Sequence, residues 1–282
     1  MVRTTAHLLK KSLDDFIKND GPRMSAALAY YAAFSLAPLL LIAVAIAGAF
    51  FGDEAVRGAL NEELSRAMGP SAAHVVEDMV AHARKPADNL LVSAIGITLL
   101  LVGAAGLFGQ LQAALNTIWK VGPSRDQGFK KFIRSHLLSF SMVLVTGFLL
   151  LVSMILTTTL QILATRLGEI ANLPLAAWMA GSGILSFAVV TMLFAAIFKI
   201  LPNTSIQWRD VWVGALFTAV LFMAGKLAIG WYLGREATTS SYGSAGAFVT
   251  VLMWLYYSSM ILLFGAGFTE VRVRHRQSTS PP

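Results

Sequence analysis

Three side chains that can bind a metal ion recur at four-residue spacing in one segment. His74, Asp78 and His82 would share one face of a helix, and histidine and aspartate are ligands that Zn²⁺ accepts. The first and third positions are about 12 Å apart along a helix axis, so one helix cannot place all three side chains on one ion. We interpret them as a solvent-exposed face, with a transient two-ligand site as the alternative.

Lys226 is the second residue whose chemistry stands out, because it lies within an apolar run over residues 211–233. A lysine in the hydrocarbon core of a membrane costs at least about 2.5 kcal/mol on insertion scales. Two interpretations are open. In one, the ammonium faces a polar cavity and binds a lipid phosphate or another anionic substrate. In the other, the side chain snorkels toward the membrane surface.

Catalytic patterns are missing from the sequence. The chain has no cysteine, which excludes thiolate metal sites and cysteine nucleophiles. Phosphodiester hydrolysis calls for clustered acids and histidines around a metal, whereas the acids here are scattered along the chain. No nucleophile elbow, P-loop or zinc signature occurs. We therefore predict no enzymatic activity, no metal and no cofactor.

The elements that must position Lys226 are membrane-spanning helices. Of the 282 residues, 56% are hydrophobic and 13% are charged, which is too apolar for an ordinary soluble domain. Crossing a hydrocarbon core of about 30 Å takes roughly 20 apolar residues. Runs of about this length occur at 27–51, 91–115, 136–162, 174–200, 211–233 and 245–269. The fold prediction is an all-α integral membrane protein with six transmembrane helices and a helical extracytoplasmic insert between the first and second.

The distribution of Lys and Arg sets the orientation of these spans. With six spans, both termini share one side, and that side carries 15 basic residues against six on the other. Positive charge is retained in the cytoplasm, so both termini are predicted to be cytoplasmic. The basic residues flank the ends of spans, which favours anionic membrane lipids as partners and argues against nucleic acid.

The predicted membrane domain covers residues 25–273 and is flanked by two cytoplasmic segments. Residues 1–24 are predicted to form an amphipathic helix on the inner membrane surface, because apolar residues recur there at helical spacing opposite charged ones. These apolar residues are Leu9, Leu13, Phe16 and Ile17. Residues 274–282 are predicted to be a disordered tail.

The insert at residues 52–90 is the one long segment predicted outside the membrane. Its apolar residues have helix-like spacing on both sides of a Gly69-Pro70 break, which predicts two amphipathic helices.

Counting residues along the spans places Ser182 and Trp254 near the depth of Lys226. The fifth span runs outward, so Lys226 lies roughly 22 Å above its inner end. A hydroxyl contact with Ser182 or a cation–π contact with Trp254 is therefore expected. Glu270 lies at the inner end of the sixth span, nearly a membrane thickness from the lysine, which excludes a salt bridge between them.

Small residues recur in the first two spans and allow helix backbones to approach closely. They are Ala29, Ala33 and Ala37, then Gly103, Gly106 and Gly109. A hinge at the glycines is the alternative. Pro38 predicts a kink in the first span, with Ser35 or water satisfying the freed carbonyl.

Several short motifs follow one another in a fixed order. They are Ala26-Ala27-Leu28-Ala29-Tyr30-Tyr31, Phe34-Ser35-Leu36, Pro38-Leu39-Leu40, Leu115-Asn116-Thr117-Ile118-Trp119, Leu201-Pro202-Asn203, Trp208-Arg209-Asp210, Gly214-Ala215, Gly225-Lys226, Trp231-Tyr232-Leu233, Tyr242-Gly243-Ser244-Ala245-Gly246, Trp254-Leu255-Tyr256-Tyr257-Ser258 and Leu263-Phe264-Gly265-Ala266. In this order they resemble the YihY/virulence factor BrkB family over approximately residues 20–273.

The resemblance implies a bacterial inner-membrane protein with six spans. Members of the family resemble proteins once labelled ribonuclease BN, and others connected with serum resistance or with lipopolysaccharide and lipid export. One departure is Gly267, which stands where the family usually has a glutamate. Glu270 lies on about the same helical face, one turn closer to the cytoplasm, and is the candidate for that acid's role.

Three functions compete on this basis. The first is transport or export of an anionic lipid or another amphipathic substrate. The second is a membrane scaffold that binds an envelope partner through residues 52–90. The ribonuclease interpretation ranks third, because no cluster of acids or histidines supports it.

Overall fold

The computed structural model describes residues 2–84, 106–122, 175–236 and 243–279. Within these ranges every regular element is a helix, which confirms the all-α prediction for them. The helices are α1 (Val2–Lys18), α2 (Gly21–Phe51), α3 (Asp53–Met68), α4 (Pro70–Arg84), α7 (Leu175–Ile200), α8 (Trp208–Glu236) and α9 (Gly243–Thr279), with one more helix over 106–118.

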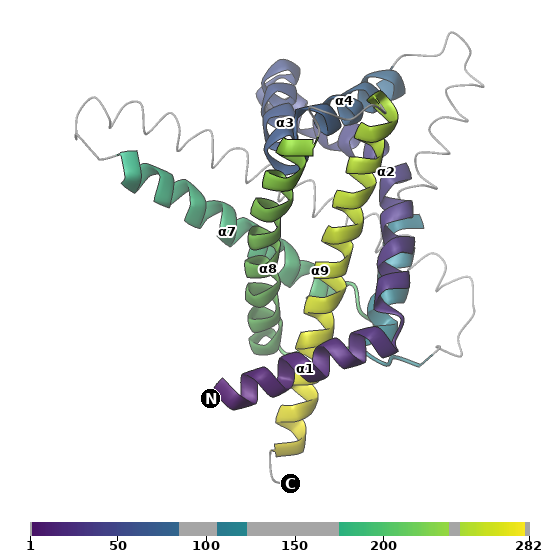
Figure 1. Cartoon of the computed structure of the whole chain (residues 1–282), viewed down its shortest axis with the longest axis vertical. Coiled ribbons are helices and arrows are strands. Elements are labelled where there is room, and N and C mark those ends of the chain that lie inside the picture. Colours follow the sequence, from purple (N-terminus) through teal and green to yellow (C-terminus); the bar gives the residue numbers. More distant parts are fainter. Residues whose placement is uncertain (1, 85–105, 123–174, 237–242, 280–282) are drawn as a thin grey trace.

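Long helices coincide with four of the predicted spans. The runs at 27–51, 174–200, 211–233 and 245–269 fall in α2, α7, α8 and α9, which form the body of the molecule in Figure 1. In the described part of the chain, two helical segments are long and apolar enough to cross a membrane, Trp208–Ile229 and Gly246–Ser278. The run at 136–162 and most of 91–115 lie outside the described residues.

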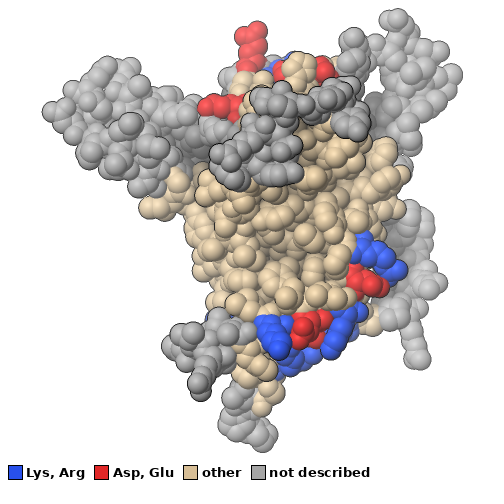
Figure 2. Space-filling view, viewed as in Figure 1, with Lys and Arg blue, Asp and Glu red and all other residues tan. Residues whose placement is uncertain are grey.

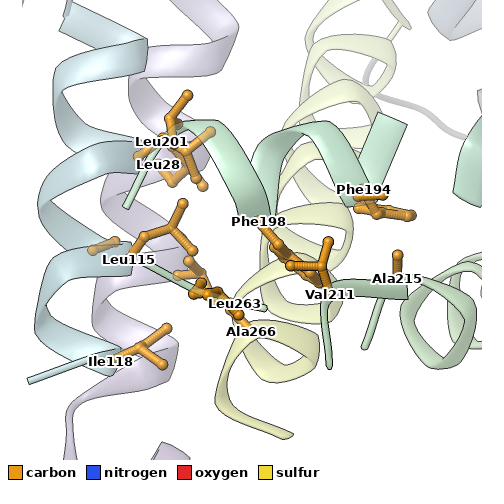
Figure 3. Close-up of a cluster of buried hydrophobic side chains, with 14 of the residues drawn as sticks. Leu28, Leu115, Ile118, Phe194, Phe198, Leu201, Val211, Ala215, Leu263 and Ala266 are labelled. Carbon is orange, nitrogen blue, oxygen red and sulfur yellow. The ribbon is translucent and has the colours of Figure 1, made fainter. Parts of the chain in front are cut away.

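Buried apolar side chains from six helices meet in one core, part of which is shown in Figure 3. Leu115 of helix 106–118, Phe198 of α7 and Leu263 of α9 have no exposed surface. The α8 side of this core consists of small residues at four-residue spacing, which lets the larger side chains of its neighbours approach closely. These small residues are Val211, Ala215 and Ala219.

Two glycine–threonine pairs bring α8 and α9 into close contact. Gly214 of α8 faces Thr269 of α9, and Gly265 of α9 faces Thr218 of α8, so closely that an added Cβ on either glycine would overlap the facing hydroxyl. Each threonine is fully buried and donates to the carbonyl of the glycine one turn earlier on its own helix, at 2.7 Å. The motif residues Gly214 and Gly265 are therefore packing positions between antiparallel helices.

The segment between α7 and α8 is fixed to helix 106–118 by two hydrogen bonds. The backbone N–H of Asn203 donates to Oδ1 of Asn116 at 2.9 Å, and Nε2 of Gln112 donates to the carbonyl of Leu201 at 3.0 Å. The first of these bonds joins two of the motifs, across 87 residues of sequence. The asparagines of the two motifs therefore hold this loop against helix 106–118. Pro202, between Leu201 and Asn203, is buried.

The predicted pair of helices on either side of Gly69-Pro70 is confirmed as α3 and α4. Gly69 ends α3 with a φ of +87°, a region that favours glycine. Ala72 and Val76 of α4 are buried with Val251 of α9, and the partly buried side chains packed on them include Leu36, Leu40 and Trp254. The two helices therefore pack onto the bundle, at the end opposite α1 and the C-terminus (Figure 1).

One local prediction is wrong, and one of two alternatives for another is removed. The predicted disorder of residues 274–282 does not hold for 274–279, because α9 continues to Thr279 and its arginines pair with acids on other elements. The hydroxyl of Ser35 does not take up the Phe34 carbonyl that Pro38 leaves free, since it donates to the carbonyl of Tyr31. The helix α2 is continuous through Pro38.

Candidate functional site

Lys226 projects from the face of α8 that packs on the core. It continues a series that begins with the fully buried Val211, Ala215 and Ala219 and includes the partly buried Phe222. At about 100° per residue, all five positions fall within a narrow sector of the helix. The lysine side chain, itself partly buried, therefore leaves α8 toward the interior of the bundle.

The exposed flank of α8 is a different sector. Trp212, Leu216, Val220 and Leu227 are exposed and lie about 40° to 120° around the helix from Lys226, on average about 85°. A lysine that only needed to reach the membrane surface would be expected on this flank. The position of Lys226 on the core face favours the first interpretation, in which the ammonium faces the interior of the bundle and binds an anionic group there.

Contacts between α8 and α9 fix the level of Lys226. The ring of Phe222, one turn before the lysine, meets Trp254 edge-on at a centroid distance of 5.8 Å. Gly225 lies against the phenol of Tyr257, where an added Cβ would overlap the hydroxyl oxygen. The structure thus places Trp254 and Tyr257 within about one turn of the level of Lys226.

Ser182 is not brought to this level. Phe194 of α7 meets Phe222 at a centroid distance of 5.8 Å, and Ser182 lies 12 residues, or about 18 Å, farther along α7. Lys226 lies only about 6 Å beyond Phe222. The helix α7 also slopes away from α8 toward its N-terminal end (Figure 1). Counting from the ends of the spans assumed upright helices, and the tilt of α7 removes the basis for that contact. The side chain of Ser182 lies outside the described part.

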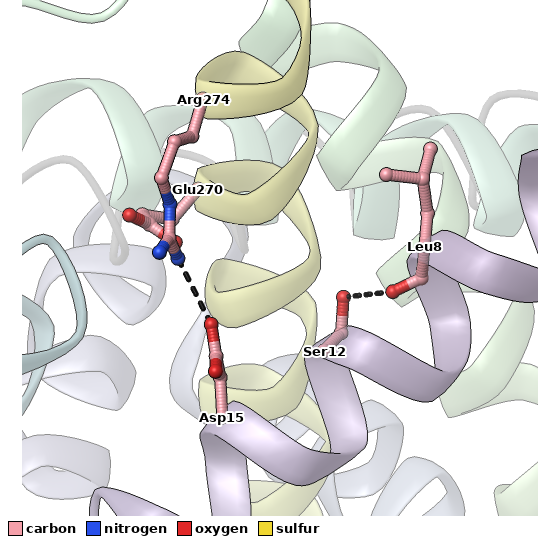
Figure 4. Close-up of polar contacts among 5 residues, drawn as sticks. All are labelled: Leu8, Ser12, Asp15, Glu270 and Arg274. Carbon is pink, nitrogen blue, oxygen red and sulfur yellow. Dashed lines mark hydrogen bonds and ion pairs between the residues drawn. The ribbon is translucent and has the colours of Figure 1, made fainter. Parts of the chain in front are cut away.

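Glu270 belongs to a separate polar cluster at the other end of α9. Its carboxylate pairs with Nη2 of Arg274 at 2.5 Å, and the same nitrogen pairs with Asp15 of α1 at 2.9 Å (Figure 4). Glu270 lies 13 residues, or about 20 Å, beyond Tyr257 along α9. The acid nearest the family's glutamate position therefore joins α9 to α1 and is remote from Lys226.

A second ion pair at this end joins α9 to the start of α8. Nη1 of Arg276 lies 3.2 and 3.3 Å from the two carboxylate oxygens of Asp210, and its Nη2 donates to Gln207 at 3.0 Å. Asp210 is buried, in the first turn of α8. Sequence reasoning missed both ion pairs between helices; the only local signal was the four-residue spacing of Glu270 and Arg274.

The structure describes the side chains of two of the three residues considered for a metal site. His74 and Asp78 contact each other at 3.2 Å and are exposed, whereas the side chain of His82 lies outside the described residues. Among the residues that the structure describes, no group of three or more metal-ligating side chains occurs.

The other motif positions are spread over the bundle. Tyr30 and Tyr31 are exposed on α2, with the Tyr31 ring 3.1 Å from where a Cβ on Gly106 would lie. Gly246 accepts a hydrogen bond from Thr250 at 3.0 Å in the first turns of α9. Trp119 is partly buried against the core, and Tyr242 lies outside the described part of the chain.

Comparison with known proteins places this chain among membrane proteins. The family model for virulence factor BrkB matches residues 12–282. A UPF0761 membrane protein of Ralstonia nicotianae is 27% identical over 87% of this chain and 54% of its own length, and one of Azotobacter vinelandii is 29% identical over 89% and 59%. A third, from Mannheimia succiniciproducens, is 26% identical over 91% of this chain and 86% of its own length.

The chain spans only somewhat more than half the length of the Ralstonia and Azotobacter relatives. No solved structure matches the chain. The matches agree with the family that the ordered motifs resemble, and they confirm that expectation.

Proposed function

On the premise that the chain belongs to the virulence factor BrkB family, we propose that it transports or exports an anionic amphipathic substrate such as a lipid. Lys226 is the cationic contact for this substrate, with Trp254 beside it. The proposal contains no catalytic step, cofactor or metal. In this proposal the protein lies in the bacterial inner membrane and crosses it six times.

The distribution of charge supports this topology. Lys and Arg side chains gather at the end that carries α1 and the C-terminus, and a broad band without charged residues covers the middle of the molecule in Figure 2. A band of this kind matches the hydrocarbon core, and a basic end matches the cytoplasmic side. In this orientation both termini are cytoplasmic, and α3 and α4 are extracytoplasmic.

The placement of Lys226 on the core face of α8 is the observation that carries the proposal. Inserting this lysine costs at least about 2.5 kcal/mol, and an exposed position would let the ammonium reach water at the surface. An ammonium that points into the bundle instead provides positive charge where an anionic headgroup can enter between helices. Ionisable residues inside spans commonly mark such pathways.

Mass spectrometry of the purified protein with its bound lipids tests this role. We expect wild type and Lys226→Arg to retain a specific anionic lipid and Lys226→Met to retain roughly tenfold less, because a charge-assisted hydrogen bond contributes about 1.5–3 kcal/mol. Leu227→Met is the matched control, since this neighbour lies on the exposed flank of α8. The same unselective lipids in all four proteins would contradict the proposal.

The scaffold function remains the second candidate, supported by the surface of α3 and α4. Their exposed acids lie at the end opposite α1: Glu54, Glu62, Glu77 and Asp78. A partner with a basic surface would suit this face. Loss of an envelope partner on replacing these acids by their amides, with lipid retention unchanged, would favour the scaffold over transport.

A further inference from the structure

The helix α1 crosses the end of the bundle at a steep angle to α9 (Figure 1), and two contacts fix its rotation. Phe16 meets Phe264 of α9 edge-on at 5.8 Å, and Asp15 pairs with Arg274 at 2.9 Å. Phe264 and Arg274 are about 15 Å apart along α9, with Arg274 nearer the C-terminus. The Phe16 side of α1 therefore faces the middle of the bundle, and the Asp15 side faces the charged end.

Two large apolar side chains of α1 lie exposed on its Phe16 side. Leu13 is 49% exposed and Ile17 is 59% exposed. At about 100° per residue, they lie roughly 60° and 100° around the helix from Phe16, in the direction away from Asp15. Their flank thus faces the level of the uncharged band without being covered by any described helix.

Two of the three exposed lysines of α1 occupy the other flank, and the third, Lys10, lies about 120° from Phe16 at the edge of the apolar flank. Lys11 and Lys18 are exposed and lie roughly 140° and 160° from Phe16, on the Asp15 side. An apolar flank toward the band and a basic flank toward the charged end are the features of a helix that lies in a membrane interface.

The charges left on this surface are mainly positive. Asp15 pairs with Arg274, and Asp20 pairs with Arg23 at 2.7 Å, so both aspartates are matched within the protein. The remaining exposed charged residues of α1 between residues 7 and 18 are three lysines and one aspartate. They are Lys10, Lys11, Lys18 and Asp14. Such an excess of positive charge attracts anionic headgroups.

We propose that α1 is an interfacial helix that binds the anionic lipids of the cytoplasmic leaflet. Leu13 and Ile17 enter the boundary of the acyl chains, the lysines contact the headgroups, and Phe16 and Asp15 hold the helix against α9. This surface is separate from Lys226, whose level on α9 near Tyr257 lies about 10 Å along the helix from Phe264 and about 25 Å from Arg274. It depends on the membrane orientation proposed above and on no transported substrate.

Spin labels on single cysteines test the depth of each flank, and the chain has no cysteine of its own to interfere. The variants are Leu13→Cys, Ile17→Cys, Lys11→Cys and Lys18→Cys in the full chain, reconstituted in bilayers containing phosphatidylglycerol. We expect labels at 13 and 17 to be accessible to oxygen, which partitions into lipid, and shielded from a water-soluble nickel chelate. Labels at 11 and 18 are expected to show the reverse.

Equal accessibility of both pairs to the nickel chelate would overturn the proposal. So would labels at 13 and 17 that are shielded from both reagents, since that result means a protein surface or a second copy of the chain covers the flank.

A second measurement tests the preference for anionic lipid. The combined Lys10→Gln, Lys11→Gln and Lys18→Gln variant is expected to lose the greater depth of the Leu13 label in phosphatidylglycerol compared with phosphatidylcholine. An unchanged difference between the two bilayers would contradict a headgroup role for the lysines. Lipid retention at Lys226 should be unaffected, so failure of this inference and failure of the proposed function are distinguishable.

Discussion

Gly265→Leu is expected to prevent the close packing of α8 on α9 and to leave little monodisperse protein in detergent. The Cα of Gly265 lies against Thr218, which is fully buried and hydrogen-bonded to the carbonyl of Gly214. Because the Cβ of Thr218 would also lie only 2.9 Å from an added carbon on Gly265, turning the hydroxyl aside does not relieve the overlap. Even Gly265→Ala is expected to destabilise the fold by about 3 kcal/mol, the upper end of the range for overpacking.

Gly267 is the matched control, two residues farther along α9. Nothing lies within 4 Å of where its Cβ would be, so Gly267→Leu is expected to unfold at the same temperature as wild type or slightly above it. The measurement is the temperature at which each detergent-solubilised variant loses its monodisperse elution peak. Similar losses for Gly265→Leu and Gly267→Leu would show that the α8–α9 contact is not as close as the structure has it.

A compensating change separates packing from backbone effects. Thr218→Gly removes the side chain that Gly265→Ala would overlap, so the double variant is expected to recover part of the stability lost in Gly265→Ala alone. Effects at residues in contact are not additive, and a recovery of about 1 kcal/mol or more is the expected size of such coupling. Simple addition of the two single effects would contradict this account.

The sequence predicted the existence of these helices better than their partners. Long continuous apolar runs are sufficient to locate α2, α7, α8 and α9, because lipid permits few other structures. Such runs do not say which face of a helix meets which neighbour. The alanines of the first span stood out by their regular spacing, whereas Gly214 and Gly265 did not, since each is paired with a threonine rather than another small residue.

The same limit explains what was missed in the candidate site. The depth of Trp254 followed from counting residues, but the tilt of α7 that removes Ser182 depends on tertiary packing. The ordered C-terminal part of α9 was missed because its charged sequence has no apolar run. Its partners Asp15 and Asp210 lie 259 and 66 residues away from the arginines they bind, so no local pattern reveals them.

Arg276→Met is the second substitution with a large expected effect. Asp210 is 4% exposed, and its carboxylate accepts from Arg276 at 3.2 and 3.3 Å. Removing one partner of a buried pair leaves an uncompensated charge and typically costs 3–5 kcal/mol. The side chain of Arg276 is 44% exposed, and the first turn of α8 favours an acid in any case. We therefore expect a smaller loss, about 2 kcal/mol.

Arg272→Met is the control for this prediction, because Arg272 lies one turn earlier on about the same face of α9 and no acidic partner is found for it among the described residues. The free energy of unfolding in detergent is measured for both variants, and again in an Asp210→Asn background. With the buried charge removed, Arg276→Met should cost at least about 1 kcal/mol less than in the wild type, which is the coupling expected of a direct contact. An equal loss of unfolding free energy in both backgrounds would mean that the ion pair between Arg276 and Asp210 does not stabilise the contact of α9 with α8. If the coupling is present, Arg274 and Arg276 together connect α9 to α1 and to the start of α8.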